Sequence, residues 1–110
     1  MGNEEHPFSM GSPRDALVNL VERALRAEAG VREQQTNGKP TGYYAGRKAG
    51  FVASAATLAS MLFGTDYEAA KATISKSVAD AGKGLLSSDL RRPSFAGQLA
   101  TEITNSALNL

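Results

Sequence analysis

The stretch from Gly42 to Gly64 constrains the fold of this chain more than any other feature of its sequence. Between Phe51 and Phe63 it holds no charged residue, and its only polar side chains are hydroxyls. The run is shorter than the roughly 20 apolar residues that a membrane-spanning helix needs. It is long enough for a helix that is apolar on all sides, which packing partners normally surround. The sequence therefore predicts a central, buried helix from about Tyr43 to Phe63, rich in alanine and glycine.

Three further segments carry apolar residues at helical spacing. The first begins at Ser12, a favourable N-cap that Pro13 follows. The next begins directly after Gly64 with Thr65 as its predicted cap, and the last begins at the predicted cap Ser94. Residues 85–90 have room for one short helical turn, and no segment alternates as a half-buried strand does. We therefore predict an all-α fold, a small bundle of about four helices whose second and third helices form a tight hairpin.

The composition suits one domain, because 42% of the 110 residues are hydrophobic and 21% are charged. Residues 1–11 differ from the rest, since they hold acids, Pro7 and the single histidine and have no apolar run. We predict a polar N-terminal tail over residues 1–11 and a single α-helical domain over residues 12–110. The first residues do not resemble a signal peptide and the chain has no cysteine, so we expect a cytoplasmic protein that does not bind membranes.

Small residues recur at four-residue spacing in the predicted central helix, at Gly46, Gly50 and Ser54. Such a stripe lets another helix backbone approach closely. Each glycine inside a helix costs about 1 kcal/mol relative to alanine, so two of them indicate that something packs against this face. We predict a helix-packing or oligomer face here, and a partner that is a second copy of the chain or another protein.

Catalysis has little support in the sequence. His6 is the only histidine and lies in the predicted tail, and no nucleophile motif or carboxylate pair at helical spacing accompanies the serines and acids. The lack of cysteine excludes thiolate metal sites, and no cluster of carboxylates suggests another kind. We therefore predict a protein that is not an enzyme, with no catalytic residue, metal or cofactor.

The start of the central helix is the best candidate for binding a ligand. Tyr43, Tyr44, Arg47 and Lys48 lie within its first turns, where free N–H groups and the helix dipole favour anions. Arg47 can form a fork to a phosphate or carboxylate, and the tyrosines can stack on a ring. These residues predict a site for a phosphate-bearing, nucleotide-like ligand. The alternative is structural, with the tyrosines packing at the start of the helix and the cations in water.

A second anion candidate is Arg91 with Arg92, just before the predicted cap Ser94. A phosphate on that serine would also lie beside two arginines. Lys39, in the loop before the central helix, can join either site if the fold brings them together.

The overall charge of the chain helps to rank the possible functions. The formal net charge is only +1, so we do not expect a dedicated nucleic-acid binder, although weak binding through the basic helix start stays a third alternative. The sequence favours first an assembly or interaction module, either a homo-oligomer or a subunit of a larger complex. Second comes a protein that binds a small anionic ligand.

Overall fold

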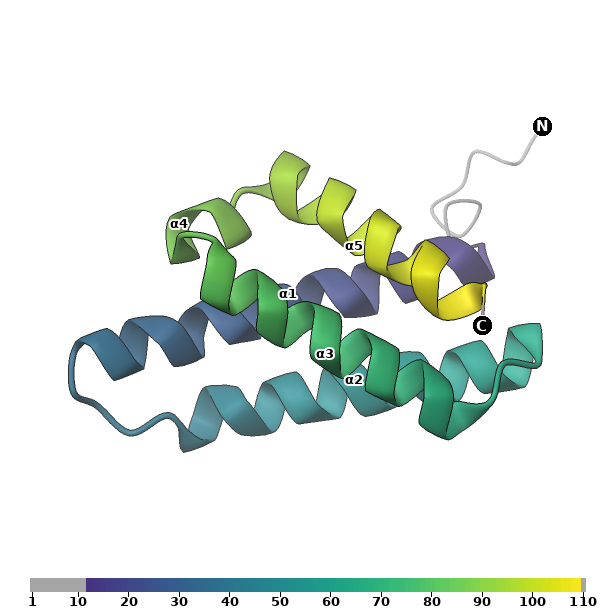
Figure 1. The fold of residues 1–110 in the computed structure, drawn as a ribbon, viewed down its shortest axis with the longest axis horizontal. Coiled ribbons are helices and arrows are strands. Elements are labelled where there is room, and N and C mark those ends of the chain that lie inside the picture. The colour runs from purple at the N-terminus through teal and green to yellow at the C-terminus, as the bar shows by residue number, and fades with distance from the viewer. Residues whose placement is uncertain (1–11, 110) are drawn as a thin grey trace.

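The computed structural model describes residues 12–109, which form an all-helical structure without strands. Figure 1 shows the helices in chain order, and their bounds are α1 (Pro13–Thr36), α2 (Gly42–Phe63), α3 (Tyr67–Gly84), α4 (Ser87–Leu90) and α5 (Pro93–Leu108). The all-α prediction is confirmed, and the predicted short turn within residues 85–90 is α4. The predicted tail, residues 1–11, lies outside the described residues, as does Leu110.

The helix ends follow local sequence signals, with two corrections. Ser12 caps α1 by accepting a hydrogen bond from the Asp15 backbone N–H at 3.1 Å, as predicted. Asp66 caps α3, not Thr65; its carboxylate accepts from the Ala69 N–H at 2.9 Å. Pro93 takes the first helical position of α5, so Ser94 lies inside the helix and is not its cap. Proline at that position needs no hydrogen-bond partner for its nitrogen, which explains the shift.

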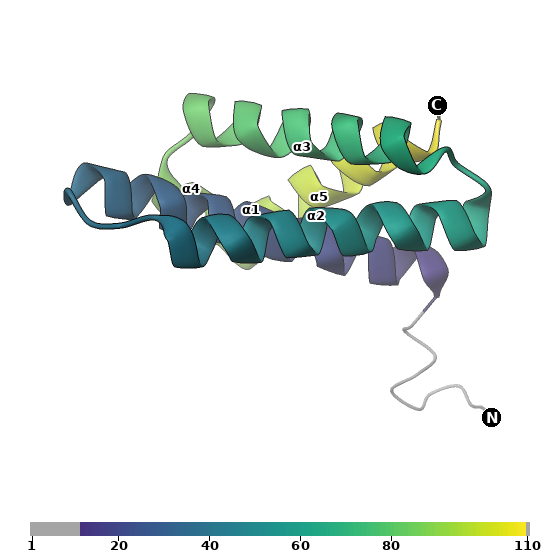
Figure 2. The same cartoon turned by 90° about the horizontal axis from the view of Figure 1, so that it is seen from below.

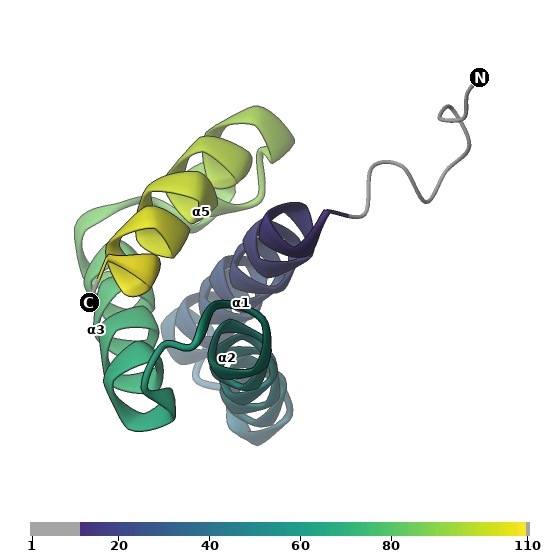
Figure 3. The same cartoon turned by 90° about the vertical axis from the view of Figure 1, so that its right-hand side faces the viewer.

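The central helix is α1, and the prediction that α2 has this place is wrong. α1 contacts each of the other four helices, and Figure 3 shows it between α2 and α5. It also has the longest run of buried residues, from Ala27 to Val31. α2 buries only one face. Its opposite face is exposed but carries no charged residue. In the sequence, this lack of charge led to the prediction of a helix that is buried on all sides. The buried residues of α2 are Val52, Ala55, Ala56 and Ala59.

α2 and α3 run antiparallel and are joined by a short turn (Figure 2). Gly64 ends α2 with φ of 71°, in the left-handed region that glycine adopts without strain. Its N–H donates to the Ser60 carbonyl at 3.1 Å, which satisfies one carbonyl at the helix end. None of the helices within residues 12–109 has the length and apolar character to cross a membrane.

A buried carboxylate links three of the helices. Glu28 of α1 is 1% exposed, and its Oε2 accepts from Arg32 Nε and its Oε1 from Lys48 Nζ, each at 2.8 Å. Gly82 of α3 lies against the same carboxylate, and a Cβ at that position would come within 2.6 Å of Glu28 Cδ. The absence of a side chain at Gly82 therefore leaves room for the ion pair where α1, α2 and α3 meet.

We predict that Lys48→Ala lowers the free energy of unfolding by about 1–3 kcal/mol, because a buried carboxylate loses one of its two partners. Urea denaturation followed by circular dichroism measures the change. Lys39→Ala is the matched control, since Lys39 is an exposed loop residue with no ion pair within residues 12–109; it should change stability by less than about 0.5 kcal/mol. Equal losses in the two variants would contradict a structural role for Lys48.

Candidate functional site

Four arginines from three parts of the chain line one open cleft of about 410 Å³. The cleft lies between α1 and α2 and reaches the turn that connects α4 to α5. Arginine side chains are rarely grouped without carboxylates between them, since like charges repel. The lining residues are Arg23, Arg26, Ala27, Tyr44, Arg47, Phe51 and Arg91.

Two of the four arginines have a carboxylate partner. Arg26 forms an ion pair with Glu22 one turn away on α1. Arg91 donates from Nε and Nη2 to the two oxygens of Glu33, each at 2.9 Å. Arg23 donates only to the neutral amide oxygen of Asn19, at 3.0 Å. Within residues 12–109, no carboxylate lies within ion-pair distance of Arg23 or Arg47. The cleft therefore keeps an excess of positive charge.

Aromatic rings hold Arg47 in place. Its guanidinium carbon lies 5.2 Å from the centre of the Phe51 ring and 5.7 Å from that of Tyr43. Such contacts stabilise a guanidinium group while leaving its in-plane N–H donors free. Tyr43 in turn meets the Tyr44 ring edge to face, with centroids 5.1 Å apart. The start of α2 thus forms one connected cluster of two tyrosines, a phenylalanine and an arginine.

Tyr44 lies at the junction of α1 and α2 because Gly30 makes space for it. A Cβ at Gly30 would lie 2.7 Å from Cε1 of the Tyr44 ring, so only glycine allows this approach.

The hydrogen bond from Arg91 lowers the pKa of Glu33, against a smaller opposing effect of burial. The same bond raises the pKa of Arg91, and the nearby Tyr44 adds to this. Arg91 is therefore held between the end of α1 and the start of α2.

The cleft unites three of the predicted ligand residues and excludes the others. Tyr44, Arg47 and Arg91 line it, although they come from two sites that the sequence treated separately. Tyr43 contacts Arg47 from outside the lining. Lys48 is engaged by Glu28. The remaining two candidates lie elsewhere. Lys39 is exposed in the loop before α2, and Arg92 forms an ion pair with Asp89, with 3.4 Å between Nη1 and Oδ1.

Sequence analysis missed Arg23 and Arg26, which lie in the predicted first helix but were not among the candidate ligand residues. They are three residues apart, so they are neighbours on the surface of α1. That spacing was a usable signal, but only the packing of α2 and Arg91 beside α1 makes it part of a site. Phe51 was missed because it was counted as part of the apolar run.

The predicted packing face of α2 has no partner within the described chain. Gly46, Gly50 and Ser54 are all exposed, and a Cβ at either glycine would meet no atom within 4 Å. No helix within residues 12–109 therefore covers these two glycines. Whether a second chain covers them stays a prediction.

Comparison of this chain with protein-family models, curated protein sequences and solved structures found no match. Between residues 12 and 109, no group of three or more histidine, aspartate or glutamate side chains is arranged to hold a metal ion. The chemistry that the described cleft offers is therefore that of guanidinium donors, which bind anions through charge-assisted hydrogen bonds.

We predict that the ionisation of Glu33 makes the free energy of unfolding depend on pH in the acid range. Because its pKa is lowered in the folded state, its contribution is present above the unfolded pKa of about 4.3 and is lost as pH falls through the folded value. The pair is exposed, so the contribution is at most about 1 kcal/mol. Glu33→Gln should therefore be less stable than wild type at neutral pH, by an amount that disappears as the pH falls below the lowered pKa of Glu33 in the folded state.

Urea denaturation at a series of pH values measures this difference. The control is Glu102→Gln, which removes an exposed carboxylate from the middle of α5 that has no ion pair within residues 12–109. Parallel pH curves for wild type and Glu33→Gln would show that the pair with Arg91 contributes nothing.

Proposed function

We propose that this protein is not an enzyme but a binding protein that holds a small anionic, phosphate-bearing ligand in the arginine cleft. The observation that carries this proposal is that four guanidinium groups converge on one cleft, two of them without a carboxylate partner among residues 12–109. The cleft volume of about 410 Å³ falls within the range of about 300–1,000 Å³ that small-molecule sites occupy.

The charge balance supports a ligand with more than one negative charge. Glu22 and Glu33 balance Arg26 and Arg91, which leaves Arg23 and Arg47 to be balanced by a ligand. A phosphate group offers several acceptor oxygens to the forked donors of arginine, and it carries up to two charges itself. A single carboxylate would balance only half of the excess.

Nucleic acid is a weaker alternative. A long phosphate backbone binds to an extended basic surface, and its affinity falls steeply with salt. This chain has a net charge of only +1, and four of its seven arginines lie together in one cleft instead of along an extended surface. A compact anion matches this distribution better than a polymer does.

We predict that Arg47→Ala and Arg91→Ala each weaken the binding of pyrophosphate by about tenfold or more, since each removes charge-assisted hydrogen bonds. Isothermal titration calorimetry at fixed ionic strength measures the affinity. Arg92→Ala is the matched control: it removes the same side chain from the residue next to Arg91, outside the cleft. If Arg92→Ala weakens binding as much as Arg91→Ala, pyrophosphate responds to overall charge and the cleft is not the site.

A second function, self-assembly, is favoured by the outward face of α2. The face consists of Gly46, Gly50, Ser54, Thr57 and Met61, which are all exposed and uncharged. Their spacing of three or four residues places them along one stripe of the helix. Met61 is 75% exposed, while the space above the two glycines is empty. We propose that an antiparallel second copy would place each Met61 over the glycines of the other copy.

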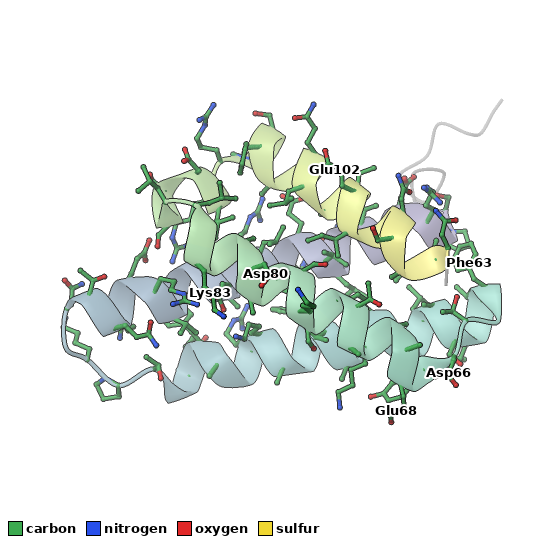
Figure 4. The ribbon with its side chains drawn as sticks, in the orientation of Figure 1. Phe63, Asp66, Glu68, Asp80, Lys83 and Glu102 are labelled. Atoms are coloured by element: carbon green, nitrogen blue, oxygen red, sulfur yellow. The ribbon has the colours of Figure 1, made fainter. Side chains whose placement is uncertain are left out.

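The charges at the two ends of α2 agree with this arrangement. Arg47 lies near its start, whereas Asp66 and Glu68 follow the turn at its far end, after Phe63 (Figure 4). Antiparallel pairing would bring each basic end towards the acidic end of the other copy. A parallel pair would bring like charges together.

We predict that a mixture of Gly46→Cys and Met61→Cys proteins forms a covalent heterodimer on mild oxidation, because the chain has no cysteine of its own. Non-reducing gel electrophoresis and mass spectrometry measure the product. Gln98→Cys, an exposed position on α5, is the control and should not cross-link to either variant. Cross-linking of Gly46→Cys only with itself would contradict the antiparallel arrangement, and none above the control would contradict assembly through this face.

A further inference from the structure

The aromatic rings around the arginine cleft are engaged by protein groups. The Arg47 guanidinium covers the Tyr43 and Phe51 rings, at 5.7 Å and 5.2 Å from their centres. Phe51 is also partly buried and packs against the hydrophobic core. The Tyr44 ring lies on the backbone of Gly30 and meets Tyr43 edge to face. Protein groups therefore already contact both rings that line the cleft, Tyr44 and Phe51, whereas the exposed ring of Tyr43 lies outside the lining.

The guanidinium donors, in contrast, retain binding capacity. Arg91 uses Nε and Nη2 for Glu33, and Arg23 uses Nε for Asn19. The other terminal nitrogens of Arg23, and those of Arg47, have no hydrogen-bond acceptor within residues 12–109, while Tyr44 lies near Arg91. Stacking on two rings also restricts Arg47 before any ligand arrives, which reduces the entropy lost on binding. The cleft therefore offers prearranged donors without a free aromatic platform.

From this arrangement we infer that the cleft recognises a chain of linked phosphate groups and makes no use of an attached base. The inference rests on the proposed anion-binding function and states the ligand class for the same cleft. Two or more adjacent phosphates match separate guanidinium groups on α1, on α2 and after α4. Tyr43 then acts as a positioning residue for Arg47 and does not touch the ligand.

The experiment compares tripolyphosphate with ATP, both without divalent cations, and includes adenosine and inorganic phosphate, using calorimetry on the full chain. The expected result is that tripolyphosphate and ATP bind within about threefold of each other, inorganic phosphate binds at least about tenfold more weakly, and adenosine does not bind. ATP binding more than about tenfold tighter than tripolyphosphate would overturn this inference and leave the anion-binding function standing. If neither binds, the proposed function is wrong and the inference falls with it.

Tyr43→Ala gives a second, independent readout. Tyr43 is 69% exposed, so the variant should keep its fold, which circular dichroism checks. If Tyr43 positions Arg47, Tyr43→Ala lowers the affinity for tripolyphosphate and the affinity for ATP by the same factor, about threefold. If Tyr43 stacks on the base, only the affinity for ATP falls, and the inference is overturned. Leu62→Ala, which also shortens an exposed apolar residue of α2 but lies outside the cleft, should change neither affinity.

Discussion

The bundle depends on the buried carboxylate of Glu28. A buried charge is tolerated only when it is paired and hydrogen-bonded, and here the partners come from two helices. Lys48 must therefore reach α1 from α2, and α3 must pass the carboxylate with a glycine, Gly82. One charge thus determines how three helices meet at this end of the molecule, which small apolar contacts between alanines would specify less strictly.

The same ion pair orients the candidate site. Successive residues of a helix point about 100° apart, so when Lys48 turns to Glu28, Arg47 turns to a different side of α2. That side faces Arg23 and Arg26 across the groove between α1 and α2. Two adjacent cations consequently have different tasks, because Lys48 contributes to folding while Arg47 keeps its donors free within the described residues. We expect the stability of the bundle and the geometry of the cleft to be coupled through this point.

Glycine has three different roles in this small fold. Gly30 and Gly82 allow close contacts, with the Tyr44 ring and the Glu28 carboxylate respectively. Gly64 provides the left-handed turn after α2. Gly46 and Gly50 contact nothing within 4 Å at their missing side chains, so the structure of the single chain does not explain them. Each costs about 1 kcal/mol relative to alanine in a helix, and coverage of them by a second chain stays a prediction.

The sequence by itself determined the helices and several of their ends, because periodicity, the Ser12 cap and Gly64 act over a few residues. It also identified Tyr44, Arg47 and Arg91 as anion-binding candidates from their chemistry. Only the tertiary structure decided that α1 is central, since an uncharged helix face of glycine and hydroxyl residues looks the same in sequence whether buried or exposed. It alone decided that Lys48 pairs with Glu28, and that Arg23 and Arg26 join Arg91. Such pairings join residues far apart in the chain, and no local pattern encodes them.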